Sequence, residues 1–393
     1  MNEMKRILLV SPVRSHPSTT GASARIGQMA ESLSRMGHEV HFLHLQQPVW
    51  GAERQMRRYW GARYHVFRGL TPASCVARAR RKVVRIAAKT LHRNLPVDAY
   101  FDRRSGGYVR SRIAGLAFDV VIVSYVFYSK ILESFPDSTL KILDTHDVFS
   151  ERYRLYKDQG LRAEFFSTTR AEERKALERA DLVLAIQDWD AAHFRSLTDK
   201  PVAVVGHLEP PGEPGGTPAA MPEAGILFVG GPMAINAHGV TWFTREVLPR
   251  VLSRVPAAEL WLAGGICSHF RRRIPGVRAL GFVEPITDLY QRASVVINPQ
   301  QFGTGLSIKC IEALAHGRAL VTTVSGARGL EDGEQHAFLS ARSPEEFADL
   351  IVLLLQDRAR AAALGRDAAA FARRYHQKHL QALTDAVNVA KPR

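Results

Sequence analysis

Cysteine is scarce in this 393-residue chain. The three cysteines, Cys75, Cys267 and Cys310, are scattered, so they form neither the spacing of a zinc site nor a disulfide framework. Long apolar runs are also missing, because no stretch approaches the roughly 18 residues that a membrane-spanning helix needs. The apolar stretch near the N-terminus breaks at Ser11-Pro12, which is too short for the hydrophobic region of a signal peptide. These absences favour a cytoplasmic protein.

Acidic residues are almost missing from residues 54–112. This segment has 16 Lys and Arg against Asp98 and Asp102, so it carries nearly all of the formal net charge of +15. Residues 76–93 repeat apolar side chains every three or four positions and place basic side chains opposite, which indicates an amphipathic helix. We expect residues 54–112 to contact an anionic membrane surface, peripherally and at its inner face. A solvated helix face is the alternative. No recognisable DNA- or RNA-reading motif is present, so we expect no nucleic-acid partner.

The composition is that of a soluble globular protein, with 46% hydrophobic and 23% charged residues. The length predicts two domains. Residues 207–224 are rich in Pro and Gly without periodicity, which is typical of a linker. The predicted domains are therefore residues 1–206 and 225–375, and residues 376–393 form a C-terminal helix or tail that can cross back to the first domain.

Residues 295–330 are the most informative part of the chain. They read as a buried strand, a loop with Gly303 and Gly305, a helix that begins near Leu306 and stops at Gly317, and a second strand. Strand, loop, helix and strand make a right-handed crossover unit. Its loop presents main-chain N–H groups and the positive end of a helix, which together favour an anionic phosphate.

Lys309 and Glu312 are three residues apart and share one face of this predicted helix. A lysine at this position can neutralise a phosphate oxygen. A carboxylate one turn later can accept hydrogen bonds from two vicinal hydroxyls, such as those of a ribose. The pattern indicates a nucleotide site, and an ordinary surface Lys–Glu pair explains the spacing equally well.

The run from residue 303 to 330, GTGLSIKCIEALAHGRALVTTVSGARGL, resembles the donor-binding motif of retaining glycosyltransferases of the GT-B fold. The similarity is to the large family-four group, which includes bacterial surface polysaccharide enzymes. It implies an α/β protein of two doubly wound, Rossmann-like domains that face each other across a cleft. Glu312 matches the second motif glutamate and is implied to hold the donor ribose. The first motif glutamate is replaced by Thr304, which leaves the donor sugar open, although a known branch of the family has Gly-Thr-Gly here.

The resemblance implies further donor contacts. The loop from Gly303 to Leu306 would receive the diphosphate, with Lys309 offsetting its charge as a catalytic residue. Phe282 and Val283 belong to a run similar to the family's GFV element, whose backbone edge meets the nucleobase; a short core strand is the plain alternative. Many members carry an arginine and a lysine after the first strand of this domain, and this chain has neither there.

In the N-terminal half, the predicted strand 141–143 leads into the run Asp-Thr-His-Asp. A histidine between two carboxylates at the end of a strand is a reasonable polar site. The run also resembles the motif whose histidine faces the donor sugar in related enzymes. His146 is therefore the first candidate of this domain, with Asp147 as a second catalytic candidate and Arg152 as a substrate-binding one.

Two other runs have ordinary explanations. Gly21 lies in a polar loop where the family binds acceptor or phosphate, but the loop also reads as a turn capped by Ser23. Asp188 and Asp190 resemble the metal-binding Asp-x-Asp of another glycosyltransferase fold. They directly precede a predicted helix at 191–197, where Asp188 suits the cap position and Asp190 the first turn. We expect no metal.

These patterns predict glycosyl transfer from a nucleotide-diphosphate sugar to a glycan or lipid-linked acceptor, with retention, without metal and without a further cofactor. Two alternatives share the architecture. A nucleotide-sugar 2-epimerase would act on the donor alone, and a non-catalytic subunit would bind a partner glycosyltransferase.

Overall fold

The computed structural model describes residues 3–45, 52–67, 93–212 and 224–390. The chain divides into two compact units. The N-terminal unit comprises residues 1–208 and 379–393, and the C-terminal unit comprises residues 209–378. Most of the expected basic helix at 76–93 and most of the expected linker at 207–224 lie outside the described residues.

The described part of the N-terminal unit contains a parallel sheet of seven strands in the order β3-β2-β1-β4-β5-β6-β7. The strands are β1 (Arg6–Ser11), β2 (Glu39–His44), β3 (Tyr64–Val66), β4 (Val120–Ser124), β5 (Leu140–Asp144), β6 (Leu182–Ala185) and β7 (Val202–Val204). The α-helices in its described part are α1 (Gly21–Arg35), α2 (Ala52–Trp60), α4 (Arg103–Tyr108), α5 (Tyr153–Lys157), α6 (Arg170–Leu177) and α7 (Asp188–Arg195).

Both faces of this sheet are buried. Along β1, Leu8 and Val10 join one hydrophobic cluster, whereas Ile7 and Leu9 join another, as the alternation of side chains along a strand requires. The first cluster includes residues of α6 and α7, and the second includes residues of α1 and α2. Near-continuous apolar strands are typical of parallel sheets covered on both sides, and this explains the runs RILLV and VVIV.

The C-terminal unit contains a parallel sheet of six strands in its described part, in the order β10-β9-β8-β11-β12-β13. The strands are β8 (Gly225–Val229), β9 (Glu259–Ala263), β10 (Val277–Gly281), β11 (Val295–Asn298), β12 (Leu320–Thr323) and β13 (Leu339–Ala341). The helices are α8 (Ala234–Trp242), α9 (Leu248–Leu252), α10 (Thr287–Arg292), α11 (Ile308–Ala315), α12 (Pro344–Gln356) and α13 (Arg358–Asn388).

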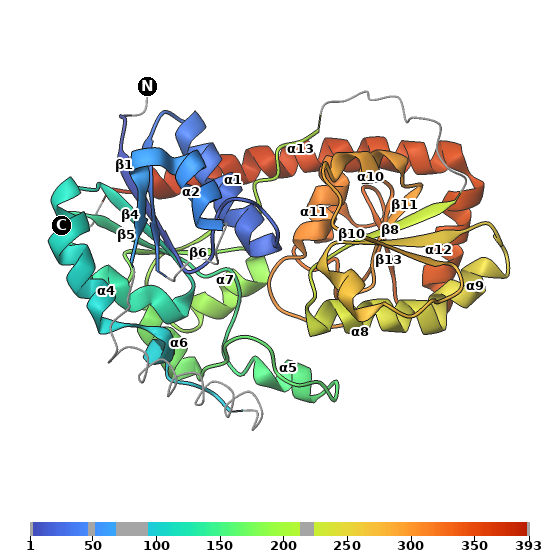
Figure 1. The fold of residues 1–393 in the computed structure, drawn as a ribbon, viewed down its shortest axis with the longest axis horizontal. Helices are drawn as coiled ribbons and strands as arrows, with labels where there is room; N and C mark the ends of the chain where they lie inside the picture. The colour runs from blue at the N-terminus through green and yellow to red at the C-terminus, as the bar shows by residue number, and fades with distance from the viewer. Residues whose placement is uncertain (1–2, 46–51, 68–92, 213–223, 391–393) are drawn as a thin grey trace. The chain divides into compact units, whose positions relative to one another are not determined.

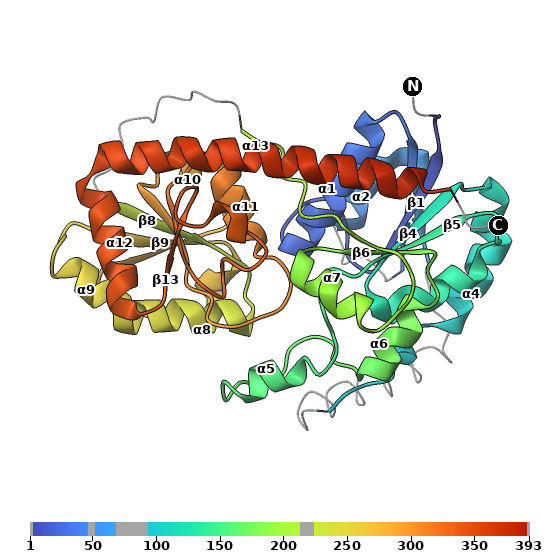
Figure 2. The same cartoon turned by 180° about the vertical axis from the view of Figure 1, so that it is seen from behind.

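Helices cover this sheet as well (Figures 1 and 2). The ring of Phe347 on α12 contacts Trp242 and Phe243, with centroids 5.8 Å apart in each pair. On α11, the buried Ile311 and Leu314 share the helix with the partly buried Glu312. The helix ends as expected before Gly317, whose φ of 62° is left-handed and favours glycine.

The long helix α13 belongs to both units, because its residues up to Lys378 are part of the C-terminal unit and its last residues are part of the N-terminal one. Leu383, Ala386 and Val387 are buried in the cluster that also contains Ile7. The carbonyl of Val387 accepts a hydrogen bond of 2.7 Å from Lys5 Nζ. The residues after 375, expected as a C-terminal helix or tail, thus continue a helix that begins at Arg358.

Several expected boundaries were wrong. The sequence predicts a helix over residues 164–179, but α6 begins only at Arg170, capped by Thr169, because the preceding segment is extended and Thr168 bridges Ser150. It also predicts a helix over residues 239–252, but α8 begins earlier, at Ala234. Strands β3, β7 and β13 and helices α2, α4, α5 and α10 had not been expected. Among the described helices, none combines the length and the apolar character that crossing a bilayer requires.

Candidate functional site

The strand order of the C-terminal unit marks the place where a ligand can bind. Strands β8 and β11 are neighbours, and the strand order reverses between them. In such sheets ligands bind at the carboxyl ends of the strands at this switch point. The loops that leave β8 and β11 there contain Gly230 and Gly231, and Gly303 and Gly305, respectively.

The loop after β11 adopts a conformation that requires glycine. Gly303 has φ 146° and Gly305 has φ 72°. A Cβ atom on Gly303 would lie only 2.6 Å from Gln300 Nε2 and 2.9 Å from Ile235 Cδ1, so this loop packs directly against the start of α8. Helix α11 begins at Ile308 with Ser307 at its N-cap, two residues later than expected. Leu306 is therefore a buried loop residue and not the first residue of the helix.

Lys309 follows this loop on α11. Its Nζ atom lies 3.4 Å from Ser307 Oγ and 5.8 Å from the centroid of the Phe228 ring, on strand β8. Burial lowers the pKa of Lys309 from its ordinary value. A partly desolvated ammonium group gains more from a neighbouring anion than a hydrated one, because water screens it less.

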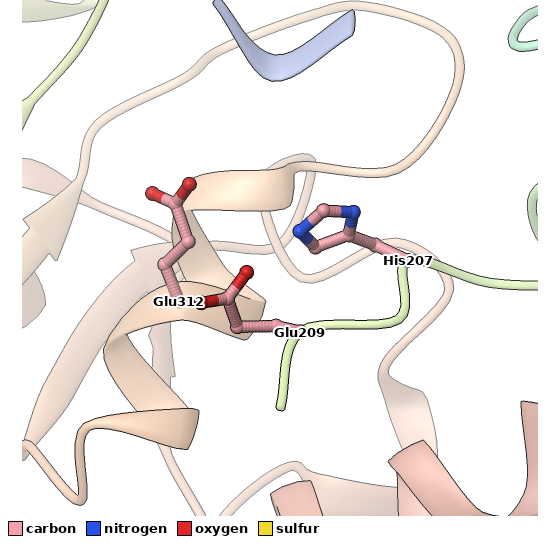
Figure 3. A group of neighbouring side chains, drawn as sticks. All are labelled: His207, Glu209 and Glu312. Carbon is pink, nitrogen blue, oxygen red and sulfur yellow. The ribbon is translucent and has the colours of Figure 1, made fainter. Parts of the chain in front are cut away.

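Glu312 lies one turn further along α11. Its Oε2 atom accepts a hydrogen bond of 3.3 Å from the hydroxyl of Tyr290 on α10. The carboxylate oxygens of Glu209 and Glu312 lie within 4.8 Å of each other (Figure 3). Burial and the charge of Glu209 raise the pKa of Glu312 to about 7, although Tyr290 and Lys309 act in the opposite direction. The site thus places a cation and a perturbed carboxylate on one helix beside a glycine loop. Perturbed carboxylates gather at functional sites.

The two residues expected to meet a nucleobase lie just beyond a strand. The sequence predicts a strand over residues 277–283, but β10 ends at Gly281, which has φ 73°. The carbonyl of Gly281 accepts a hydrogen bond of 2.7 Å from the N–H of Gly264. Phe282 is 73% exposed and Val283 is half-buried. The short-core-strand alternative fails for Phe282, because its ring is in solvent.

In the N-terminal unit, His146 lies directly after β5. It is buried and has φ 63°, a strained value for a residue with a Cβ. Its Nε2 atom lies 3.0 Å from Asp144 Oδ2, and its ring stacks on Tyr125 with centroids 4.2 Å apart. Tyr125 follows β4 and also has a positive φ of 74°. Unfavourable backbone conformations of two neighbouring residues are often found at functional sites.

Asp144 is held by a buried arginine that sequence reasoning missed. Arg25 of α1 is 2% exposed and contacts both carboxylate oxygens of Asp144, the shortest distance being 2.6 Å. It also donates to the carbonyls of Val205 and Gly206. Burial alone would raise the pKa of Asp144, but Arg25 and His146 outweigh it and hold this pKa well below its ordinary range. The one available signal was a charged residue among the apolar positions of α1.

Asp147 and Arg152 are brought together by the structure. Arg152 Nη1 donates to Asp147 Oδ2, and the guanidinium carbon lies 5.5 Å from the centroid of the Phe149 ring. Burial would lower the pKa of Arg152, but Asp147 and Tyr156 raise it above its ordinary value. The segment itself is anchored by Glu173, a fully buried carboxylate that accepts from the N–H of Phe149.

The structure shows how the two runs with ordinary explanations begin their helices. The expected capped turn is present and uses Ser23, which forms a reciprocal capping box with Thr20; Thr20 is the N-cap, and Gly21 is the first residue of the helix. Gln187 occupies the N-cap position of α7, so Asp188 lies in the first turn. Asp190 is buried and accepts a hydrogen bond of 3.1 Å from Gln187 Nε2.

Residues 223–357 match the family model described as glycosyl transferases group 1. A curated relative, an uncharacterized 44.6 kDa protein in the cps region of Klebsiella pneumoniae, is 26% identical over 139 residues. That match covers 32% of this chain, and the chain spans only 36% of the relative's length.

Solved structures resemble the whole chain. Sucrose-phosphate synthase from Thermosynechococcus elongatus has 16% sequence identity and a TM-score of 0.67, with 97% of each chain covered. A mutant of S. aureus TarM in complex with Fondaparinux, alpha-GlcNAc-glycerol and UDP has 10% identity and a TM-score of 0.69, with 98% of this chain and 100% of that chain covered. At these identities the likeness shows the fold, and the expected fold class is confirmed. The chain has the GT-B fold, and its residues 223–357 are similar to the glycosyl transferases group 1 family.

Proposed function

We propose that this protein is a glycosyltransferase that moves a sugar from a nucleotide-diphosphate donor to a glycan or lipid-linked acceptor. One observation carries the proposal. Within the segment that matches group 1 glycosyltransferases, Glu312 lies one turn after Lys309 and the glycine loop, at the switch point of the sheet. This order suits a ribose, a phosphate-neutralising cation and a diphosphate, in that spatial sequence.

The donor contacts follow from this arrangement. The main-chain N–H groups from Gly303 to Leu306 would hold the diphosphate, and Lys309 would offset its charge. Phe282 and Val283 would border the nucleobase. Thr304 stands where many relatives have a glutamate toward the donor sugar, so the hydroxyl of Thr304 would take over one contact to a sugar hydroxyl.

For the reaction we propose retention. The bond between the sugar C1 and the diphosphate oxygen breaks, the acceptor oxygen bonds to C1 on the same face, and the acceptor proton passes to the departing diphosphate. The protein then mainly positions the reactants and stabilises the leaving group, which together can lower the barrier by several kcal/mol. His146 would contact the donor sugar, with Asp147 and Arg152 beside it, and Gly21 would border the acceptor. In this scheme Lys309 and the N-terminus of α11 offset the phosphate charge without a metal ion.

We further propose that the acceptor is presented at the inner face of a membrane, as in surface polysaccharide assembly. Two observations support this. The curated relative is named for the cps region of Klebsiella pneumoniae. The described part of residues 54–112 exposes Arg54, Arg58, Arg110 and Arg112 to solvent.

Sedimentation with liposomes tests the membrane proposal. We expect the protein to bind vesicles that contain anionic lipid and not neutral vesicles, because each basic residue near the surface contributes about 1 kcal/mol. Reversing Arg110 and Arg112 to Glu should weaken this binding at least tenfold. Reversing Arg278, an exposed arginine of β10 in the C-terminal unit, should leave it unchanged. Equal binding to neutral and anionic vesicles would contradict the proposal.

The donor proposal is tested by thermal unfolding with UDP-, GDP-, ADP-, dTDP- and CMP-sugars. A ligand present at a hundred times its dissociation constant stabilises the folded protein by about 2.7 kcal/mol, which is measurable. We expect one nucleotide family to raise the unfolding temperature. Product analysis then separates the alternatives: free nucleotide that requires an acceptor supports transfer, and an isomerised donor formed without acceptor identifies an epimerase. No shift with any donor would favour the non-catalytic subunit.

A further inference from the structure

The cations assigned to the donor site carry less positive charge than a diphosphate carries negative charge. The segment that follows β8, residues 230–236 with the sequence GGPMAIN, contains no lysine or arginine. Lys309 supplies one positive charge, whereas a diphosphate carries more than one negative charge at neutral pH. A second cation at this edge of the sheet would therefore be expected to strengthen both donor binding and departure of the diphosphate.

The loop after β12 reaches the same edge. Strand β12 pairs with β11, so their carboxyl ends are adjacent. A Cβ atom on Gly326 would lie 2.3 Å from Thr322 Oγ1 and 2.5 Å from Asn298 Nδ2, so this loop folds tightly over the end of β11. The N–H of Gly326 donates to Thr323 Oγ1 at 2.9 Å, which closes the turn. Arg328 follows this turn by two residues.

Arg328 bridges these two loops. Its Nη1 atom donates a hydrogen bond of 3.0 Å to the carbonyl oxygen of Gly303. The side chain is half-buried, and Gly303 is the residue whose conformation and packing shape the glycine loop. The guanidinium group is thus placed at the loop that we assign to the diphosphate. Arginine is suited to this role because its planar array of five donors matches phosphate oxygens and keeps its charge.

We propose that Arg328 is the second cation of the donor site and binds the diphosphate of the nucleotide sugar, in place of the basic residues missing after β8. This inference rests on the proposed function. In the ground state Arg328 would bind the phosphate oxygens, and during transfer it would stabilise the charge that grows on the departing diphosphate.

The test compares Arg328→Gln with Arg318→Gln. Arg318 is a matched control, because it also donates to main-chain carbonyls, those of His316 and Gln291, but at the amino end of β12. Calorimetry would measure the binding of UDP and of uridine. If the thermal-unfolding experiment selects another base, the diphosphate and the nucleoside of that base are used. We expect R328Q to weaken diphosphate binding by tenfold to a hundredfold and nucleoside binding by less than threefold. R318Q should change neither.

Two further measurements show whether Arg328 acts through its charge or only by supporting the structure of the glycine loop. Arg328→Lys keeps the charge and should recover part of the diphosphate affinity, and it decides the question if R328Q does not fold. The dependence of diphosphate affinity on salt should be less steep in R328Q, because one ionic contact is lost. Equal losses for diphosphate and nucleoside, or no loss, would overturn the role of Arg328 and leave the proposed function standing. If wild type binds no nucleoside diphosphate, the proposed function fails, and this inference fails with it.

Discussion

Replacing Glu312 by Ala is expected to abolish measurable binding of the nucleotide sugar. If the carboxylate accepts two ribose hydroxyls, each charge-assisted hydrogen bond contributes roughly 1.5–3 kcal/mol, so losing both weakens binding at least about a hundredfold. The stabilisation of the folded protein by donor, measured as the rise in unfolding temperature, should disappear in E312A.

Glu312→Gln removes the negative charge without leaving a cavity, because Gln has nearly the same size as Glu. Its amide oxygen can still accept the hydrogen bond from Tyr290. Glu259→Gln is the matched control. Glu259 starts β9 at the opposite end of the sheet, where it accepts a hydrogen bond of 2.7 Å from Trp261 Nε1. We expect E259Q to bind donor as wild type does. Unchanged donor binding in both E312A and E312Q would reject Glu312 as the ribose ligand.

The raised pKa of Glu312 gives this prediction a dependence on pH. Only the ionised carboxylate accepts from both hydroxyls, so donor affinity should rise as the pH increases through about 7 and then level off. Below that pH the affinity should fall by up to about tenfold per unit. E312Q should show a flat profile.

The stability of the protein without ligand should change in the opposite direction. A carboxyl whose pKa is raised by folding stabilises the folded state at low pH, and this contribution is lost as the pH rises through about 7. At pH 8 wild type then contains a poorly solvated carboxylate beside Glu209. E312Q without ligand is therefore expected to unfold at a higher temperature than wild type at pH 8, and not at pH 5.

Replacing Asp144 by Asn is expected to destabilise the N-terminal unit strongly. The substitution leaves the guanidinium of Arg25 buried without a counter-charge, and breaking a buried ion pair in this way costs about 3–5 kcal/mol. For a unit of this size, that loss lowers the unfolding temperature by about 6–20 °C. Hydrogen exchange followed along β5 would locate the effect.

Two variants control this prediction. Asp137→Asn removes a carboxylate whose partner Lys141 lies at 3.0 Å but which is fully exposed, so we expect a change within about 0.5 kcal/mol. The double variant Arg25→Met/Asp144→Asn removes the stranded charge and should recover part of the stability. If D144N were as stable as wild type, the buried pair would not be what holds this part of the N-terminal unit together.

The ion pair between Arg25 and Asp144 is also expected to affect activity, because Asp144 contacts the candidate catalytic residue His146. Asp144 both binds Arg25 and contacts Nε2 of His146, whose backbone is strained. In the fraction of D144N that remains folded, the orientation of the imidazole should relax, and transfer activity should fall more than donor affinity. The test is therefore a comparison of kcat with the dissociation constant of the donor.

The sequence was sufficient where one local pattern determines one local structure. The run from strand β11 through the glycine loop to β12 was predictable because buried strands, left-handed glycines and a helix ending at Gly317 follow from short-range sterics and apolar spacing. The placement of Lys309 and Glu312 on one helix followed from their spacing alone. The length and the linker composition indicated two domains, and the fold class followed from the motif.

Local sequence patterns could not predict contacts between residues that lie far apart in the sequence. Arg25 is 119 positions from Asp144, Tyr290 is 22 positions from Glu312, and Arg328 is 25 positions from Gly303. No periodicity signals such pairs, because each arises only when the sheet order brings different strand ends together. The same holds for the pKa of Glu312, which depends on burial and on Glu209.

The sequence by itself thus determined most of the strands, the glycine loop and the chemical types of residue available at the donor site, because these depend on neighbours along the chain. Only the tertiary structure decided which charges are paired, which carboxylate is perturbed and which arginine reaches the glycine loop. Those properties depend on distance in space and on exclusion of water, and the order of parallel strands in each sheet sets both.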